Sequence, residues 1–249
     1  MIVYGRNPVR EALRGRRAQS VRDVWATSAA AREGWLGELS PRITAALEIA
    51  DRCGSDAHQG VCAEAGEYPY VPDEELLSAG DAVIVVLDEL SDPQNLGSIC
   101  RTCECAGARG VVIPERRAAE VTPAVCKASA GAVEHLALAR TRNIADFIAR
   151  ARDAGFWCYG ASADAVAARD GARERAPVAY DAPDYRGAPV ALVLGSEGRG
   201  LRPRVASACD ELIALPMRGR VASLGVAAAG AAILYEILQN REQGVDNSP

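Results

Sequence analysis

The sequence predicts an α/β fold in which a C-terminal domain with a mostly parallel sheet follows a smaller α/β domain. Short apolar runs recur from residue 82 onward, and stretches with helical periodicity separate them. A segment at residues 67–80, with two prolines and no sustained period, divides this region from the first part of the chain. The chain has 249 residues, which is enough for two domains that each bury a core.

In the C-terminal region the apolar runs are continuous, as expected of strands that are buried on both faces of a parallel sheet. We expect these strands at residues 82–87, 110–113, 156–161, 189–195 and 211–217. Helical stretches lie at residues 97–106, 123–134, 144–154 (with Asn143 as its cap) and 223–239. Residues 165–177 are expected to form an exposed loop or a frayed helix.

The pattern before residue 67 mixes helices and strands. Asn7 as cap and Pro8 predict a short helix that runs to about Leu13, and a second helical stretch covers residues 43–50. Strands are expected at residues 21–26 and 60–65. The domain boundaries that follow are 1–66 for the first domain, 67–80 for a linker and 81–249 for the second domain.

The composition excludes several classes of protein. A formal net charge of −5 argues against a general binder of polyanions, although arginines cluster in residues 1–22 and 199–220. The longest uncharged stretch, residues 221–235, is too short for a membrane span. Eight cysteines without a disulfide framework, and an N-terminus without an apolar signal core, predict a cytoplasmic protein with reduced thiols and no membrane association.

Three segments place polar residues at the carboxyl ends of expected strands, where α/β proteins bind ligands. The first, residues 88–102, has Asn95 in the turn that leads into a helix. Helical geometry puts Arg101 about 200° from the inward-facing Ile99, so its side chain faces away from the core. An arginine near a helix N-terminus opposes the helix dipole and indicates an anion or a function; the simpler interpretation is a solvated arginine.

The second segment, residues 193–201, contains three glycines, which allow backbone conformations and close approaches that side chains forbid. Its spacing matches neither the dinucleotide fingerprint nor a phosphate-binding loop, which excludes nucleotide binding through those motifs. Glu197 lies in the middle of the segment. It either anchors an arginine or a ligand, or is the solvated carboxylate of a glycine-rich turn.

The third segment, residues 215–236, begins with a loop that carries two arginines. Ser223 is expected to be the N-cap of an alanine-rich helix, which would leave backbone donors and acceptors free beside the second segment. From Ala227 to Leu238 the simpler interpretation, a buried helix, is favoured.

Other chemistry has less support. Cys100, Cys103 and Cys105 resemble half of a zinc site, but the second half is missing, so buried thiols on a helix are the favoured interpretation. His58 and His135 are isolated, and the chain lacks the Gly-x-Ser-x-Gly elbow of hydrolases. We therefore expect neither a bound metal nor hydrolase activity.

In this order, NLGSICRT (95–102), LGSEGRGL (194–201) and LPMRGRVASL (215–224) resemble the three motifs of the SpoU (TrmH) family of RNA 2′-O-ribose methyltransferases. Outside these motifs, YGRNPVREAL (4–13), HQGVCAE (58–64) and KASAGAVEHL (127–136) are similar to the branch that modifies a guanosine ribose in bacterial 23S rRNA. The resemblance therefore covers nearly the whole chain.

The resemblance implies a SPOUT-type trefoil-knotted domain that binds S-adenosylmethionine, a homodimer with the active site near the subunit interface, and an N-terminal RNA-binding domain like ribosomal protein L30e. Carried over by motif, the catalytic residues would be Asn95, Arg101, Glu197 and Ser223. The cofactor contacts would be Gly195, Gly198, Leu215, Met217 and Leu224. RNA phosphates are expected to contact Arg6, Arg10, Arg199, Arg202, Arg218 and Arg220.

One position departs from the family pattern. The third motif usually reads Ser-Leu-Asn, whereas this chain has glycine at position 225. The asparagine amide expected beside the reacting ribose is therefore missing, a loss of about 1–3 kcal/mol. Besides methylation of a guanosine in 23S rRNA, free or in a pre-ribosomal particle, the open alternatives are a methyltransferase for tRNA or a resistance-type rRNA site, a catalytically weak RNA-binding or ribosome-assembly protein, and a cofactor-binding protein without an RNA partner.

Overall fold

The computed structural model describes residues 1–37, 39–78, 80, 82–162, 176–221 and 223–242. An N-terminal four-stranded sheet has the order β1-β4-β2-β3, in which β4 pairs antiparallel with both β1 and β2. Its strands are β1 (Ile2–Tyr4), β2 (Asp23–Ala26), β3 (Arg42–Ile43) and β4 (Val61–Glu64). The accompanying helices are α1 (Arg6–Ala12), α2 (Gly34–Gly37) and α3 (Ala46–Cys53), with short 3₁₀ turns η1 (Ala18–Ser20), η2 (Ala30–Arg32) and η3 (Asp56–His58).

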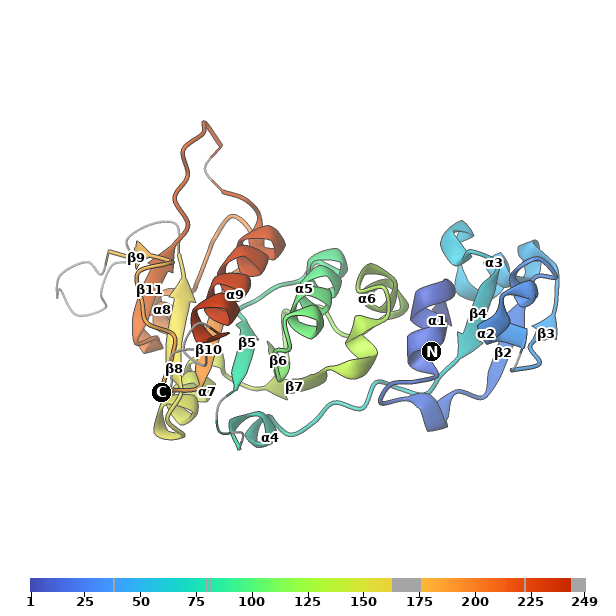
Figure 1. Cartoon of the computed structure of the whole chain (residues 1–249), viewed down its shortest axis with the longest axis horizontal. Coiled ribbons are helices and arrows are strands. Elements are labelled where there is room, and N and C mark those ends of the chain that lie inside the picture. The colour runs from blue at the N-terminus through green and yellow to red at the C-terminus, as the bar shows by residue number, and fades with distance from the viewer. Residues whose placement is uncertain (38, 79, 81, 163–175, 222, 243–249) are drawn as a thin grey trace.

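A second sheet of seven parallel strands has the order β7-β6-β5-β10-β8-β11-β9 (Figure 1). Its strands are β5 (Val83–Leu87), β6 (Gly110–Pro114), β7 (Ala137–Thr141), β8 (Trp157–Ala161), β9 (Val178–Ala179), β10 (Val190–Leu194) and β11 (Glu211–Ala214). The helices of this region are α4 (Asp73–Leu77), α5 (Pro93–Cys105), α6 (Pro123–Ala128), α7 (Ile144–Asp153), α8 (Pro203–Ala208) and α9 (Val226–Glu242), with the 3₁₀ turn η4 (Ala132–His135). No helix in these ranges is long and apolar enough to cross a membrane.

The parallel sheet is buried on both faces, as its continuous apolar runs predict. Along β5, Val85 and Leu87 pack in a core that includes residues of α5, α6 and α9. Ile84 and Val86 pack in a second core with residues of α7 and α8. The predicted α/β class, with a mostly parallel sheet after a small α/β domain, is therefore confirmed.

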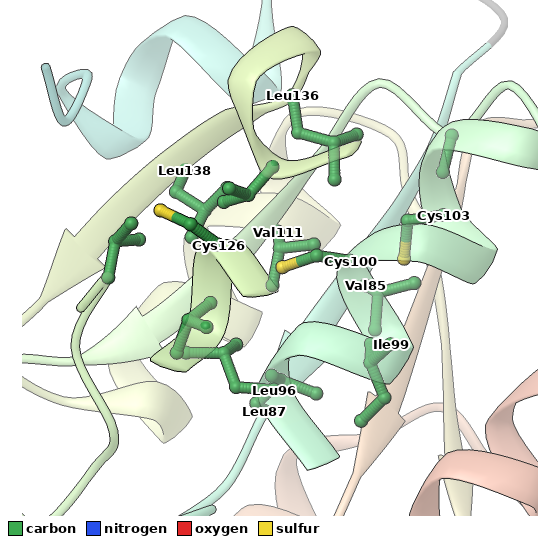
Figure 2. Close-up of a cluster of buried hydrophobic side chains, with 14 of the residues drawn as sticks. Val85, Leu87, Leu96, Ile99, Cys100, Cys103, Val111, Cys126, Leu136 and Leu138 are labelled. Atoms are coloured by element: carbon green, nitrogen blue, oxygen red, sulfur yellow. The ribbon is translucent and has the colours of Figure 1, made fainter. Parts of the chain in front are cut away.

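Buried cysteines of α5 and α6 pack in the hydrophobic core (Figure 2). Cys100 and Cys103 on α5 are buried among the leucines and valines of the first core, with Cys126 of α6 nearby. Burial raises the pKa of Cys103 to about 12, so this thiol is neutral at physiological pH. In the part of the chain that the structure describes, no three His, Cys, Asp or Glu side chains come together as a metal site would require.

Several element boundaries differ from the sequence prediction. Helix α5 begins at Pro93, four residues earlier than predicted, because the side chain of Asp92 caps it by accepting a hydrogen bond from the Gln94 N–H. Helix α9 begins at Val226, and the Gly225 carbonyl accepts its first intrahelical bond, so the prediction of Ser223 as N-cap is wrong. Helix α1 begins at Arg6 after Gly5, so the predicted Asn7 cap is also wrong.

The other sequence predictions have mixed outcomes. The cap of α7 at Asn143 is confirmed, because its side chain accepts from the Ala145 N–H. Strand β7 and helices α4 and α8 were not predicted. The predicted loop at residues 165–177 lies almost entirely outside the described residues.

The segment expected as a linker packs against the parallel sheet. The Val71 N–H donates to the carbonyl of Leu138 in β7 at 2.9 Å. The Tyr68 hydroxyl donates to the Leu136 carbonyl at 2.6 Å, and Arg150 of α7 forms an ion pair with Asp73 of α4. These contacts give residues 68–73 a fixed path along the second domain.

A substitution at Gly97 tests how closely α5 packs on α6, because a Cβ added there would lie 2.4 Å from the Cβ of Ala128. In an exposed helix a change from glycine to alanine stabilises by up to about 1 kcal/mol. At Gly97 we expect the opposite sign, a loss of about 1–3 kcal/mol in the free energy of unfolding, because the core is overpacked.

Urea denaturation of Gly97→Ala measures this loss. Ser98→Ala, at the neighbouring exposed position of the same helix, is the control and should change stability by less than about 0.5 kcal/mol. A stabilised Gly97→Ala would show that α5 and α6 are not in close contact.

Candidate active site

The first two motifs meet because β5 and β10 are neighbours. Leu87 and Leu194 pair at the carboxyl ends of these strands, so the segments that follow both strands start side by side. The third motif follows β11, which is separated from β10 by β8. It returns to the others through α9, which packs on α5 and β10.

A buried carboxylate holds the start of the first two motifs together. The Asp88 N–H donates to the Leu194 carbonyl at 2.8 Å, and Asp88 as a whole is 1% exposed. That carboxylate accepts from the Arg202 backbone N–H at 2.9 Å and from its Nε at 2.8 Å. The hydrogen bond to Asp88 raises the pKa of Arg202. Arg202, expected to contact RNA, therefore has its guanidinium engaged in fixing the second loop.

The glycines of the second motif make a tight turn. Ser196 and Gly200 exchange two backbone hydrogen bonds, of 3.1 and 2.9 Å, and close the loop. Gly195 has the closest approach, because an added Cβ would lie 2.2 Å from the carbonyl carbon of Gly200. Gly198 has a φ of 77°, which L side chains rarely adopt. The loop requires these glycines and presents the side chain of Glu197 outward.

Asn95 and Glu197 form a direct contact between the first and second motifs. The amide Nδ2 of Asn95 donates to Glu197 Oε1 at 2.9 Å and to Asp92 Oδ2 at 3.1 Å. Both N–H groups of this amide therefore have carboxylate acceptors, and its carbonyl Oδ1 is left to accept a hydrogen bond from a ligand. Sequence reasoning missed Asp92, although an Asp before a proline is a helix-start signal.

The third motif reaches the same carboxylate at Gly225. A Cβ added to Gly225 would lie 3.8 Å from Glu197 Oε1, with no other heavy atom within 4 Å. Gly225 has a φ of 78°, a conformation that asparagine tolerates better than most residues. The position at which the family motif carries asparagine therefore faces Glu197 across open space.

Arg101 lies apart from this contact. It is exposed on α5, six residues after Asn95, which is about 9 Å along the helix axis. Its outward orientation, predicted from helical geometry, is confirmed. The side chain of Arg101 forms no hydrogen bond or ion pair with any described residue. The structure thus brings Asn95 and Glu197 together and leaves Arg101 free to bind a substrate group or a second subunit.

The segment between β11 and α9 projects from the end of the sheet (Figure 1). Leu215 is half-buried, whereas Ser223 is exposed, as are Met217 (38%) and Leu224 (55%). The backbone N–H and C=O groups of Leu215 and Met217 form no hydrogen bond with any described residue. Free backbone groups beside exposed apolar side chains fit a ligand with both a polar base and apolar surface, such as the nucleoside end of S-adenosylmethionine.

The remaining predicted RNA contacts divide into two groups. Three arginines are exposed and have no acidic partner among the residues described: Arg199, Arg218 and Arg220. In the N-terminal domain, Arg6 forms an ion pair with Glu33 at 2.8 Å while remaining half-exposed. The Nε of Arg10 is buried without a partner in the described structure, so this arginine can still take an acceptor.

A cavity of about 280 Å³ lies at the opposite end of the sheet. Its lining includes the first residues of three strands, namely Trp157, Val190 and Glu211. Because the motifs follow the carboxyl ends of the strands, this cavity is separate from the site formed by Asn95 and Glu197.

Comparison with known proteins identifies the family. Residues 82–235 match the SpoU rRNA Methylase family, and residues 2–71 match the RNA 2′-O ribose methyltransferase substrate binding domain. The chain belongs to the SpoU rRNA methylase family. A Bacillus subtilis protein assigned to the TrmH family of tRNA/rRNA methyltransferases is 40% identical over 200 residues, which are 77% of this chain and 74% of that protein. The SpoU protein described here is therefore an RNA methyltransferase.

Solved structures agree with this assignment. An AdoMet-bound rRNA methyltransferase from Sinorhizobium meliloti superposes with a TM-score of 0.74 at 26% identity, covering 96% of this chain and 86% of that one. The SpoU methyltransferase AviRb from Streptomyces viridochromogenes, at 24% identity, shares the fold with a TM-score of 0.78 over 100% of this chain and 91% of its own. The C-terminal domain is thus of the SPOUT type, and the expected cofactor is the ligand of the S. meliloti enzyme.

The hydrogen bonds of the Asn95 amide to Asp92 and Glu197 predict that replacing Asn95 lowers activity with little loss of stability. Asn95→Ala removes the amide that joins Asp92 to Glu197, and we expect kcat/KM for methyl transfer to fall about tenfold to hundredfold. Gln94→Ala removes the adjacent exposed amide and is the matched control. Steady-state kinetics decide between them, and equal activity of both variants would contradict a role for the bridge.

Proposed function

We propose that this protein transfers the methyl group of S-adenosylmethionine to the 2′-hydroxyl of a guanosine in 23S rRNA, in the cytoplasm. The observation that carries the proposal is the contact of Asn95 with Glu197, which joins two family motifs at the end of the sheet. The match of residues 2–71 to a 2′-O ribose methyltransferase substrate binding domain supports the ribose as acceptor. The choice of a guanosine in 23S rRNA rests on the resemblance of residues 4–13, 58–64 and 127–136 to that branch.

Backbone groups are proposed to hold the cofactor. Those of Leu215, Met217 and Leu224 would bind its nucleoside, beside the loop of Gly195 and Gly198. When bound, S-adenosylmethionine supplies an electrophilic methyl group on a positively charged sulfur. The protein must then hold the ribose oxygen in line with that methyl group and exclude water.

Asn95 is proposed to orient the reacting ribose. Because its N–H groups donate to Asp92 and Glu197, the Oδ1 atom faces outward as an acceptor and can hold the hydrogen of a ribose hydroxyl. Glu197 fixes this amide, and Ser223 offers a further hydroxyl on the third motif. The hydroxyl proton passes to solvent as the oxygen bonds to the methyl carbon, and the sulfur keeps the electron pair of the broken bond.

Arg101 is proposed to act on the same substrate from a second subunit. Its exposure and lack of an acidic partner among the described residues suit a guanidinium that binds the adjacent phosphate and stabilises the developing alkoxide. Since Arg101 and Asn95 of one chain are separated along α5, a homodimer would complete the site. The N-terminal domain, residues 1–66, would grip RNA through Arg6 and Arg10, in concert with Arg199, Arg218 and Arg220.

Two observations favour alternative functions. The B. subtilis relative is assigned to tRNA as well as rRNA, so tRNA is the second candidate substrate. Gly225 lacks the amide of the family motif, which favours a weak enzyme that retains RNA binding, as in ribosome assembly. Transfer of labelled methyl groups to unmodified 23S rRNA and to tRNA, followed by mapping of the ribose-methylated nucleotide, distinguishes these functions. Methylation of tRNA alone, or of neither RNA, would overturn the proposal.

Arg101→Ala is expected to lower methyl transfer about a hundredfold or more, because the charge facing the alkoxide and phosphate is lost. Binding of S-adenosylmethionine, measured by calorimetry, should not change. Arg186→Ala is the matched control, since Arg186 is an exposed arginine at the cavity on the opposite end of the sheet. Full activity of Arg101→Ala would remove this arginine from the mechanism.

Gly225→Asn is expected to raise kcat, by up to about tenfold, because its amide would face Glu197 as in the family motif. Gly225→Ala places a side chain without an amide at the same positive φ and should not raise kcat. Single-turnover rates compare the two variants. A slower Gly225→Asn enzyme with intact cofactor binding would show that the open space beside Glu197 is required by the substrate.

A further inference from the structure

The junction between the two domains contains a buried ion pair. Arg17, which follows α1, and Glu134, in η4, are 2% and 0% exposed. Arg17 Nε donates to Glu134 Oε2 at 2.9 Å, and Arg17 Nη2 donates to the other carboxylate oxygen. Burial alone would lower the pKa of Arg17, but the hydrogen bond and charge of Glu134 outweigh burial and raise it. Such a two-point contact fixes both the distance and the angle between its partners.

Close backbone contacts surround this pair. The Arg16 N–H donates to the Glu134 carbonyl at 2.8 Å. A Cβ on Gly15 would lie 2.4 Å from that same carbonyl oxygen, and a Cβ on Gly131 would lie 2.8 Å from the Cβ of Glu11. Figure 1 shows α1 beside α6 at this junction. A side chain at either glycine would require atoms of the other domain to shift.

The two domains also share one hydrophobic core. Val3 and Val9 of the N-terminal domain belong to the same buried cluster as Val133 and Leu136 of the second domain. The face of α1 with Asn7 and Glu11 points at η4, where Glu11 Oε2 accepts a hydrogen bond from His135 Nε2 at 2.8 Å. Arg6 and Arg10 lie on a different face of α1, about 100° away. The proposed RNA-binding arginines therefore do not lie on the face of α1 that points at η4.

We propose that Arg17 and Glu134 are positioning residues that hold the RNA-binding domain at one fixed orientation to the methyl-transfer site. This inference rests on the proposed function. RNA gripped by the N-terminal domain would then present only nucleotides at a set distance to Asn95 and Glu197. The fixed distance across the junction would then determine which nucleotide is methylated. Both domains would also bind one RNA more tightly than two domains joined by a flexible linker.

The junction can be loosened in two independent ways. Gly15→Ala inserts a Cβ against the Glu134 carbonyl, and Gly34→Ala is its control, because an added Cβ at Gly34 meets no atom within 4 Å. The double variant Arg17→Met/Glu134→Leu removes the ion pair without leaving one buried charge unpaired, which protects its folding. Small-angle scattering and hydrogen exchange of the Arg16 amide report whether the domains separate.

Each variant is then tested for RNA affinity and for the position of methylation. We expect faster exchange at Arg16, about tenfold weaker binding of 23S rRNA, and methylation at additional nucleotides, with unchanged affinity for S-adenosylmethionine. Gly34→Ala should behave as the wild type.

Two results would overturn the proposal. The first is that the domains separate while RNA affinity and the methylated nucleotide stay unchanged. The second is that neither Gly15→Ala nor Arg17→Met/Glu134→Leu changes the scattering or the exchange of the Arg16 amide. If the wild type binds RNA but transfers no methyl group, the proposed function fails, and the RNA affinities of the variants still decide the role of the junction.

Discussion

The parallel pairing of β5 with β10 is the constraint on which the site depends. These strands are separated by about a hundred residues of sequence, yet Leu87 and Leu194 lie opposite each other at the ends of the two strands. Asp88 then bonds to the Leu194 carbonyl and to Arg202, which fixes the glycine loop next to the start of α5. A shift of one residue in this register would turn buried side chains to the other face of the sheet and separate Asn95 from Glu197.

The site combines tight and open parts. The loop from Gly195 to Gly200 is closed by its own backbone and has no room for a side chain at Gly195. The segment between β11 and α9 instead has free backbone groups at Leu215 and Met217 and exposed apolar side chains at Met217 and Leu224. A tight loop that holds Glu197 and a neighbouring segment with free backbone groups for a ligand are complementary, because catalysis needs both fixed polar groups and a bound substrate.

The sequence was informative where burial determines local structure. The β5, β6 and β10 strands were located to within one or two residues because continuous apolar runs are needed in a sheet covered on both faces. Arg101 was correctly placed on the outer face of the helix from its angle to the inward-facing Ile99. Strand β7 was missed because its run Ala137–Thr141 is not continuously apolar, since it contains an arginine and a threonine.

Contacts between distant residues could not be predicted in the same way. The bond of Asn95 to Glu197 spans 102 residues, and that of Arg17 to Glu134 spans 117, so no local pattern reports them. Local sequence did not indicate that glycine is required at Gly15 and Gly131, because the atoms that leave no room for a side chain there belong to the other domain. The motif residues were recognised as a set, whereas the way in which Asp92 and Asp88 hold them required the structure.

Hydrogen exchange with and without S-adenosylmethionine is the measurement that tests the central claim most directly, namely that the second and third motifs form one cofactor site at the end of the sheet. We predict that the cofactor slows exchange of backbone amides in residues 194–200 and 215–225, and leaves the amides around the cavity at Trp157 and Glu211 unchanged. Slower exchange around that cavity, or unchanged exchange in both motif segments, would contradict this claim.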